Sequence, residues 1–301
     1  MNDTIMKQSE PYVNEKDLIP FLSCIDHTVS RETFQLLLDK STNLLVTSPR
    51  PPLDKLSAYY ESEDYISHTD SKRSIMDKAY QVIKNYSIKK KVKMINGLSG
   101  SKGRILDIGC GTGDLLSACE KNGWEINGVE PSDKARALAA KKISSKELLV
   151  SNIDEVSNDS KDRYDVISMF HVLEHVPNLL EYVAKLKELL ADDGSLIIAV
   201  PNYKSYDATY YKEFWAAYDV PRHLWHFSQD SIQHIFERIN FKVEKVLPLI
   251  FDSFYVSLLS EKYKTGKSNL FSGCKTGLLS NMKAKKTGEY SSLIYIIKNN
   301  K

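Results

Sequence analysis

Residues 104–114, Arg-Ile-Leu-Asp-Ile-Gly-Cys-Gly-Thr-Gly-Asp, constrain the fold more than any other stretch of this chain. Residues 105–108 form a short apolar run, which is typical of a strand buried on both faces. Gly109, Gly111 and Gly113 then predict a tight turn with bare backbone, and an apolar helical pattern follows at once. A strand, a glycine turn and a helix in this order predict a nucleotide-like ligand at the carboxyl edge of a parallel sheet.

The residues beside the turn indicate which ligand it accepts. A dinucleotide site would place a third glycine at position 114, but Asp114 stands there, and its carboxylate would repel a pyrophosphate. Asp107 lies two residues before the first glycine and suits a ligand with positive charge. S-adenosylmethionine carries both an ammonium and a sulfonium, so we expect Asp107 to contact the ammonium of that cofactor. We expect Gly109 to approach the ligand most closely.

A second predicted strand supports the same ligand. Residues 124–130 alternate between apolar and polar side chains and end in Glu130, about 20 residues after the glycine turn, which is the usual spacing for an acid that binds ribose hydroxyls. Pro131 and Ser132 follow as a helix start, with Ser132 as the N-cap. Glu130 is therefore predicted to bind the ribose.

Four sequence blocks resemble the class I S-adenosylmethionine-dependent methyltransferases: residues 105–114, 127–132, 164–176 and 189–202. The resemblance covers roughly residues 100–202 and points to a bacterial branch that acts on quinones, sugars and secondary metabolites. It implies that an acid or amide after the third strand and the next backbone N–H hold the adenine. Asn152 fits this place by distance and Asp154 by chemistry, and we select Asn152 with Ile153. The resemblance also implies that Phe170 and His171 lie beside the methionine end. The expected cofactor-binding residues are Asp107, Gly109, Cys110, Gly111, Gly113, Glu130, Asn152, Ile153, Phe170 and His171. The Cys110 thiol has no partner fixed by spacing, so we interpret it as packing rather than as a nucleophile.

The alternation of strand and helix patterns over residues 100–200 predicts an α/β fold with a parallel sheet. A strand pattern recurs at 241–247 and at 291–298, and the resemblance implies that the last strand inserts antiparallel. We therefore expect a Rossmann-like, seven-stranded, mostly parallel sheet with helices on both faces. A helix over about residues 72–98 leads into this core, and we take residues 72–301 as the methyltransferase domain.

Residues 1–71 precede the predicted core as a small N-terminal extension. Strand-like alternation occurs at 24–41 and 45–52, and the region resembles a ribbon that carries paired cysteines in some bacterial relatives. Only Cys24 is present here, so a tetrahedral zinc site is not expected. The resemblance implies a degenerate, metal-free ribbon.

Two predicted insertions interrupt the second half of the core, residues 202–227 and 252–289. The first is rich in aromatic and histidine residues, and the second is expected to form a mobile or helical cap. Aromatic loops beside a cofactor site favour a substrate pocket, although packing against the N-terminal region or a second subunit is the alternative. The expected substrate-binding residues are Tyr65, His68, Tyr203, Trp215, Arg222 and His226. Arg222 either pairs with an anionic substrate group or clamps the cap to the core.

Histidines are the candidate general bases, because imidazole accepts a proton near neutral pH. We select His175 and His223 as catalytic residues. His171, Glu174 and His175 also raise the question of a metal, since their spacing puts them on one helical face. No third or fourth ligand is visible in the sequence, so no metal is predicted.

Composition limits the partners. The net charge of +2 gives no general attraction for nucleic acid, and the basic residues at 84–93 are interpreted as the solvated face of a helix. No apolar run reaches the length of a membrane span, and the N-terminus lacks a secretory apolar core. Four cysteines without close pairing fit a reducing cytoplasm.

These features together predict an enzyme that transfers a methyl group from S-adenosylmethionine to a small or medium-sized molecule, with oxygen or carbon as the favoured acceptor atom. The alternative is a non-catalytic module that binds S-adenosylmethionine or S-adenosylhomocysteine. A nucleotide-dependent oxidoreductase is disfavoured by Asp114. The acceptor and the oligomeric state stay open.

Overall fold

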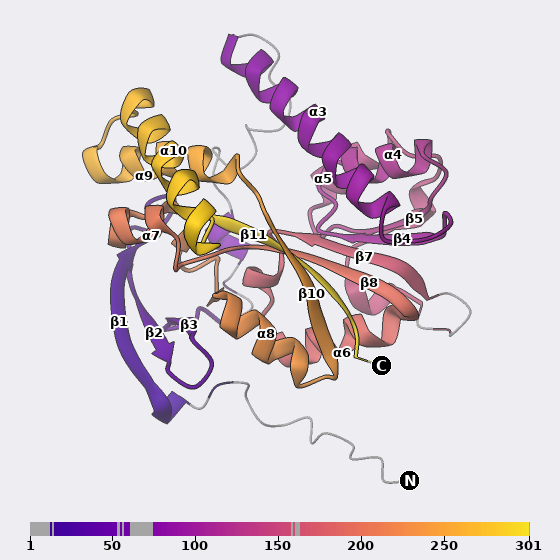
Figure 1. Ribbon diagram of the computed structural model, residues 1–301, viewed down its shortest axis with the longest axis horizontal. Coiled ribbons are helices and arrows are strands. Elements are labelled where there is room, and N and C mark those ends of the chain that lie inside the picture. The colour runs from indigo at the N-terminus through magenta and orange to yellow at the C-terminus, as the bar shows by residue number, and fades with distance from the viewer. Residues whose placement is uncertain are drawn as a thin grey trace.

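A computed structural model describes the chain over Val13, residues 15–52, Lys55, residues 57–60, 75–157, Asp159 and residues 163–300, with only the backbone described for Glu15, Ser57 and residues 75–80. Two sheets organise these residues (Figure 1). The large sheet has the strand order β10-β11-β8-β7-β4-β5-β6, and the small sheet has the order β1-β2-β3-β9. Among the described residues, no helix is both long enough and apolar enough to cross a bilayer.

The large sheet is mostly parallel, as predicted. Its strands are β4 (Arg104–Ile108), β5 (Glu125–Val129), β6 (Leu149–Val150), β7 (Tyr164–Phe170), β8 (Leu190–Pro201), β10 (Phe241–Pro248) and β11 (Ser292–Asn299). Strands β4 to β8 pair in parallel, whereas β11 runs antiparallel to both β8 and β10. The predicted seven-stranded, Rossmann-like sheet with an antiparallel last strand is therefore confirmed.

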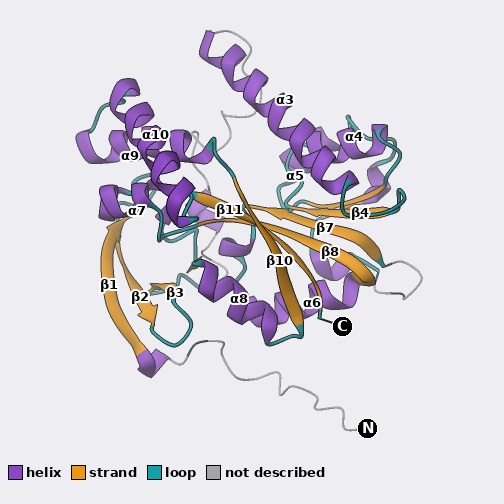
Figure 2. Ribbon diagram, in the orientation of Figure 1, coloured by secondary structure: helices purple, strands orange, loops and turns teal. Residues whose placement is uncertain are grey.

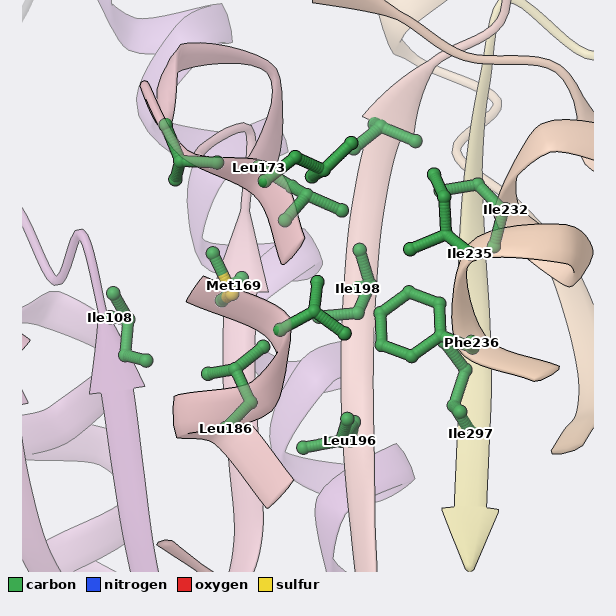
Figure 3. Close-up of a cluster of buried hydrophobic side chains, with 14 of the residues drawn as sticks. Ile108, Met169, Leu173, Leu186, Leu196, Ile198, Ile232, Ile235, Phe236 and Ile297 are labelled. Carbon is green, nitrogen blue, oxygen red and sulfur yellow. The ribbon is translucent and has the colours of Figure 1, made fainter. Parts of the chain in front are cut away.

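Apolar side chains cover both faces of this sheet, which explains the continuous apolar runs in its strands. Successive residues alternate between the faces, so that Ile105 and Ile197 belong to one buried cluster while Leu106 and Ile198 belong to the other. Figure 3 shows the cluster that contains Ile198, in which Phe236 lies against the sheet. Fully burying one such aliphatic side chain stabilises the fold by about 1.5–3 kcal/mol.

Helices enclose the sheet on both sides (Figure 2). The helices of the core are α3 (Ile75–Asn96), α4 (Asp114–Lys121), α5 (Asp133–Ala139), α6 (Leu179–Leu189) and α8 (Gln229–Glu237). Helices α3 and α4 contribute Val92, Ile95 and Cys119 to one face, and α6 and α8 pack on the other face. Short 3-10 helices are η1 (Glu15–Asp17), η2 (Ser57–Tyr60), η3 (Lys146–Leu148), η4 (Ile153–Glu155), η6 (Leu173–His175), η7 (Lys212–Phe214) and η8 (Ala216–Tyr218).

Strand β8 begins earlier than the sequence predicts. The expected strand covered residues 195–200, with Gly194 just past the end of the preceding helix. In the structure, α6 ends at Leu189, and Leu190 is already extended with φ −82° and ψ 137°. Leu190 pairs with Tyr164 across the sheet, so helix and strand join directly and Gly194 lies within β8.

The N-terminal region forms the small antiparallel sheet with β1 (Leu18–Ile25), β2 (Thr33–Asp39) and β3 (Leu44–Ser48). Its fourth strand, β9 (Trp225–His226), comes from the first insertion and pairs with β3. A third buried cluster joins Phe34 and Leu45 of the small sheet to Tyr211, Trp215 and Tyr218 of that insertion. The extension and the insertion therefore share one core, and the expected domain boundary at residues 71 and 72 lies outside the described residues.

The second insertion is a pair of helices, α9 (Asp252–Thr265) and α10 (Leu270–Thr287), beside the short helix α7 (Tyr206–Tyr211) (Figure 1). Gly277 allows close packing, because a Cβ atom there would lie 2.9 Å from the Cα of Phe254. Buried Asp207 ties α7 to α10 and to the residue before β11 by accepting hydrogen bonds from Ser280 Oγ at 2.6 Å and Ser291 Oγ at 2.6 Å. Of the two expected alternatives, the structure has the helical cap.

Candidate active site

The glycine turn lies at the carboxyl edge of the large sheet, between β4 and α4. Its three glycines have left-handed backbone, with φ of 71° at Gly109, 53° at Gly111 and 76° at Gly113. A Cβ atom at Gly109 would lie 2.4 Å from Val172 Cγ2, and one at Gly113 would lie 2.9 Å from Ala139 Cα. At Gly111 a Cβ atom would meet nothing within 4 Å. The open position of the turn is therefore Gly111, and the expectation that Gly109 approaches the ligand most closely stays a prediction.

Glu130 follows β5 and reaches back to this open position. Its Oε2 accepts a hydrogen bond from the Gly111 amide at 2.8 Å, and its Oε1 accepts one from the Ser132 amide at 2.9 Å. Arg136 donates to the Glu130 carbonyl oxygen at 2.6 Å. The Glu130 carboxylate is thus fixed beside the bare turn, where the sequence predicted a ribose-binding acid.

Asp107 lies on β4 with only 4% of its surface exposed. Its Oδ1 accepts a 2.6 Å hydrogen bond from Ser168 Oγ on the neighbouring strand β7. Burial raises the pKa of Asp107 to about 6, although the Ser168 hydrogen bond and the charge of Lys91 act in the opposite direction. A buried carboxylate of this kind gains from any further cation placed beside it.

Lys91 of α3 belongs to this site, and the sequence interpretation missed it. Its Nζ lies 3.5 Å from the centre of the Phe170 ring at the end of β7. Desolvation lowers the pKa of Lys91, while the charges of Asp107 and Asp252 oppose that effect. The basic run at 84–93 is therefore not entirely a solvated face. A signal was present, because Lys84 and Lys91 lie two helical turns apart, in line with the apolar Ile88.

Asp114 has a different role from the one expected. Its carboxylate pairs with Lys84 Nζ at 2.7 Å and with Lys142 Nζ at 3.0 Å, and Thr112 donates to it at 2.9 Å. Those two lysines offset its charge, so Asp114 repels a pyrophosphate less than the sequence argument assumed.

Asn152 and Ile153 follow the short edge strand β6, where the resemblance implied the adenine contacts. The Asn152 side chain caps η4 by accepting a hydrogen bond from the Asp154 amide at 3.2 Å. Ile153 is 5% exposed and packs into the core. Their assignment to the adenine stays a prediction.

His171 directly follows β7 and has left-handed backbone with φ 59°. Its Nε2 lies 2.9 Å from Asp252 Oδ2 at the start of α9, and its Nδ1 lies 3.3 Å from Glu174 Oε1. Desolvation by the surrounding protein would lower the pKa of His171, although its side chain is 39% exposed, but the carboxylates of Asp252 and Glu174 raise it to about 10. The ring therefore carries a positive charge at neutral pH and connects the sheet edge to the helical cap.

The two predicted catalytic histidines lie side by side. The rings of His175 and His223 are T-shaped, with centroids 4.6 Å apart. Nδ1 of His175 lies 3.0 Å from the Arg222 carbonyl oxygen and 3.0 Å from Tyr60 Oη, and Nδ1 of His223 lies 2.9 Å from the Ala217 carbonyl oxygen. Burial and the neighbouring His223 lower the pKa of His175 to about 4, so this ring is neutral at physiological pH.

Four predicted substrate-binding residues lie instead between the first insertion and the small sheet. Tyr203, Trp215, Arg222 and His226 are between 2% and 8% exposed. Tyr203 donates to the Asn43 carbonyl oxygen, and His226 contacts Thr47 Oγ1. A hollow bordered by Trp215 and Arg222 has a volume of about 10 Å³, which suffices for about one water molecule.

Arg222 fits the second of its two expected roles. Its Nη2 donates to Asp219 at 2.6 Å and to Asp26 at 3.2 Å, its Nε donates to Asp219 at 3.0 Å, and its Nη1 donates to the Tyr59 carbonyl oxygen at 3.0 Å. The guanidinium clamps the insertion to the small sheet, and these contacts occupy all three of its nitrogens. The aromatic residues among the four predicted substrate-binding residues pack in the shared core, and the assignment of these four residues to the substrate stays a prediction. Tyr65 and His68 lie outside the described residues.

Comparison with known proteins gives consistent matches. A family model described as a methyltransferase domain matches residues 76–246, which is more than half of the chain. A ubiquinone biosynthesis O-methyltransferase of Actinobacillus pleuropneumoniae is 36% identical over 115 residues, covering 36% of this chain and 48% of that protein. The match thus spans about half the length of that relative. A ubiquinone biosynthesis O-methyltransferase of Rickettsia bellii is 27% identical over 210 residues, covering 64% of this chain and 84% of that protein.

One solved structure covers nearly the whole chain. A 1,6-didemethyltoxoflavin-N1-methyltransferase from Burkholderia thailandensis, crystallised with 1,6-didemethyltoxoflavin and S-adenosylhomocysteine, matches with a TM-score of 0.53 and 14% identity. The alignment covers 92% of this chain and 100% of that one. At this identity the likeness concerns the fold.

Alanine substitutions at Gly109 and Gly111 test the packing of the glycine turn. We expect Gly109→Ala to cost clearly more stability than Gly111→Ala, because both incur about 1–2 kcal/mol of left-handed strain but only the former meets the stiff Val172 side chain. Adding Val172→Ala to Gly109→Ala should recover part of the loss. Urea unfolding of the wild type and these three variants measures these differences. Equal losses at the two glycines, or no recovery in the double variant, would contradict the packing described for Gly109.

Proposed function

The chain belongs to the class I S-adenosylmethionine-dependent methyltransferases, and we propose that it transfers the cofactor's methyl group to an oxygen or carbon atom of a small or medium-sized molecule. The observation that carries this proposal is the pairing of two carboxylates around one bare turn. Asp107 and Glu130 lie at the ends of the adjacent parallel strands β4 and β5, with open Gly111 between them. The O-methyltransferase relatives favour an enzyme over a module that only binds the cofactor.

Charged side chains of the site match the ribose, the ammonium and the carboxylate of the cofactor. Glu130 supplies a fixed carboxylate for the ribose hydroxyls, because its two oxygens are already oriented by the Gly111 and Ser132 amides. Asp107 supplies the negative charge for the ammonium. Lys91, whose charge acts on Asp107, supplies a positive charge for the amino-acid carboxylate. Asp107 and Lys91 together therefore complement a zwitterionic amino acid, which a dinucleotide does not contain.

When bound, S-adenosylmethionine supplies a methyl group that the positive sulfur has already activated. The protein then has to hold the acceptor atom in line with the methyl–sulfur bond and exclude water. Phe170 and positively charged His171 lie at the end of β7, next to the expected methionine end. An oxygen acceptor must also lose a proton. His175 and His223 each keep Nε2 directed away from the carbonyl oxygen that engages Nδ1, and we propose these atoms as the groups that assist.

The class of acceptor and the cellular location of the protein are also part of this proposal. We propose that the acceptor is a small molecule rather than a nucleic acid, because the balance of charge is close to neutral. A cytoplasmic location is supported by the free cysteines Cys24, Cys110, Cys119 and Cys274.

Calorimetric titration with S-adenosylhomocysteine tests the ribose contact. Wild-type protein should bind, and Glu130→Ala should weaken binding by at least about tenfold, because charge-assisted hydrogen bonds to two hydroxyls are lost. Glu125→Ala is the matched control, since Glu125 begins the same strand β5 and is exposed. Its affinity should equal that of the wild type. A wild-type protein that binds no S-adenosylhomocysteine would overturn the proposal.

The pH dependence of the same affinity tests Asp107. The pKa of Asp107 is raised to about 6, so the carboxyl is largely protonated at pH 5 and ionised above pH 7. Only the ionised form attracts the ligand's ammonium, which stays protonated throughout. Affinity should therefore rise from pH 5 to pH 7 by about tenfold and then level off. Asp107→Asn should bind weakly with a flatter profile. An equally steep profile in that variant would assign the dependence to another group.

A further inference from the structure

A second cluster of polar side chains lies beside the proposed cofactor site. Glu174 and His175 belong to η6, directly after β7, and His223 lies in the first insertion just before β9. One potential ligand atom from each of the three residues lies within 4.8 Å of the other two. The sequence analysis considered Glu174 and His175 with His171 and found no further ligand, because His223 is distant in the chain.

Glu174 is the unusual member of this cluster. It is 1% exposed, and neither carboxylate oxygen accepts a hydrogen bond from any described residue. Its Oε1 makes an ion-pair contact with His171 Nδ1 at 3.3 Å, which leaves Oε2 without a partner in the described structure. Leaving a buried carboxylate oxygen unsatisfied costs considerable free energy, so a further cationic partner is expected.

Both histidines are oriented as metal ligands are. Nδ1 of His175 is held at 3.0 Å by the Arg222 carbonyl oxygen, and Nδ1 of His223 is held at 2.9 Å by the Ala217 carbonyl oxygen. A carbonyl oxygen can only accept, so in the neutral rings each Nδ1 carries the proton and each Nε2 carries the lone pair. The Asp219 carboxylate lies 4.0 Å from the Nε2 atom of His223 and adds a negative charge beside the cluster. Metal-binding histidines commonly donate their second nitrogen to a backbone carbonyl in this way.

We propose that Glu174, His175 and His223 bind one divalent transition-metal ion, with Zn²⁺ as the representative, on the acceptor side of the site. This replaces the expectation of a metal-free protein and rests on the proposed methyl transfer for its role. With the ion bound, the Nε2 atoms of His175 and His223 are its ligands, so the ion replaces them as the group that assists loss of the acceptor's proton. Two imidazoles and one carboxylate favour such an ion over Mg²⁺, which prefers oxygen ligands. Three protein ligands leave a fourth position open.

Binding requires only a small contraction of the cluster. Zinc takes nitrogen and oxygen ligands at about 2.0–2.2 Å, so three ligand atoms around it lie roughly 3.3 Å apart. The spacing of up to 4.8 Å between the potential ligand atoms therefore has to shrink by about 1.5 Å at most.

The open position gives the ion a function in methyl transfer. A hydroxyl group of the acceptor would coordinate there and lose its proton to water, because a divalent metal lowers the pKa of a bound hydroxyl. The resulting oxygen then forms a bond to the methyl carbon as the carbon–sulfur bond breaks, and the electron pair of that bond stays on sulfur. The acceptor class is therefore a molecule with a hydroxyl, enol or phenol oxygen.

The test uses the full chain, stripped of metal by a chelator and titrated with Zn²⁺ and with Co²⁺. We expect one ion per chain by elemental analysis and visible absorption bands of Co²⁺ in a site of low coordination number. His223→Ala and Glu174→Gln should weaken binding by at least about a hundredfold. His234→Ala is the matched control, because His234 is an exposed histidine on α8 away from the cluster. Its metal affinity should match that of the wild type.

X-ray absorption of the zinc-loaded wild type provides a measurement that depends on no variant, and two imidazole ligands are expected. The metal site would be overturned if the wild type bound neither ion, or if His223→Ala and Glu174→Gln bound the ions as tightly as the wild type does. A coordination shell without imidazole would also overturn it. Titration of the metal-free protein with S-adenosylhomocysteine separates this failure from a failure of the proposed function. Cofactor binding with no metal binding overturns only the metal site.

Discussion

Buried charge at the carboxyl edge of the large sheet is the interaction on which the site depends. Asp107 of β4 and Asp252 of α9 both act on Lys91 of α3, and His171 after β7 bridges Asp252 to Glu174. Each carboxylate is costly to bury alone, and each becomes acceptable because a cation from another element lies beside it. The alternating charges of Lys91, Asp107, His171 and Asp252 thus connect α3, the ends of β4 and β7 and the helical cap at the carboxyl edge of the sheet.

The glycine turn beside this network opens on one side only. Gly109 and Gly113 pack against Val172 and Ala139, which fixes the turn against the rest of the core. Gly111 is left bare and is held by Glu130. The pre-organised edge can therefore receive a ligand without rearranging the backbone, which lowers the entropic cost of binding. The cofactor of this family has the charges that such an edge accepts.

The first insertion has a structural role that its composition hides. Its strand β9 completes the small sheet, and Arg222 clamps it to Asp26 while its own backbone carbonyl engages His175. Removing one partner of such a buried ion pair typically costs about 3–5 kcal/mol. The insertion thus holds the N-terminal region in place and also presents His223 to the site.

Local patterns were sufficient to predict the sheet and much of the cofactor edge. The apolar run before Gly109 and the acid at Glu130 have meanings that depend on a few neighbouring residues. Local patterns were not sufficient where the answer depends on distant pairing. The packing of Trp215 in the shared core could not be predicted because nothing local reveals that β9 pairs with β3. Lys91 looked solvated because its partners Asp107 and Asp252 come from other elements.

A crystal structure of the protein with S-adenosylhomocysteine would test the central claim most directly. The account predicts ribose hydroxyls on the Glu130 carboxylate, the amino group on Asp107 and the adenosine passing over Gly111. Ligand density at another edge of the sheet, or ribose oxygens that contact neither Glu130 oxygen, would contradict it.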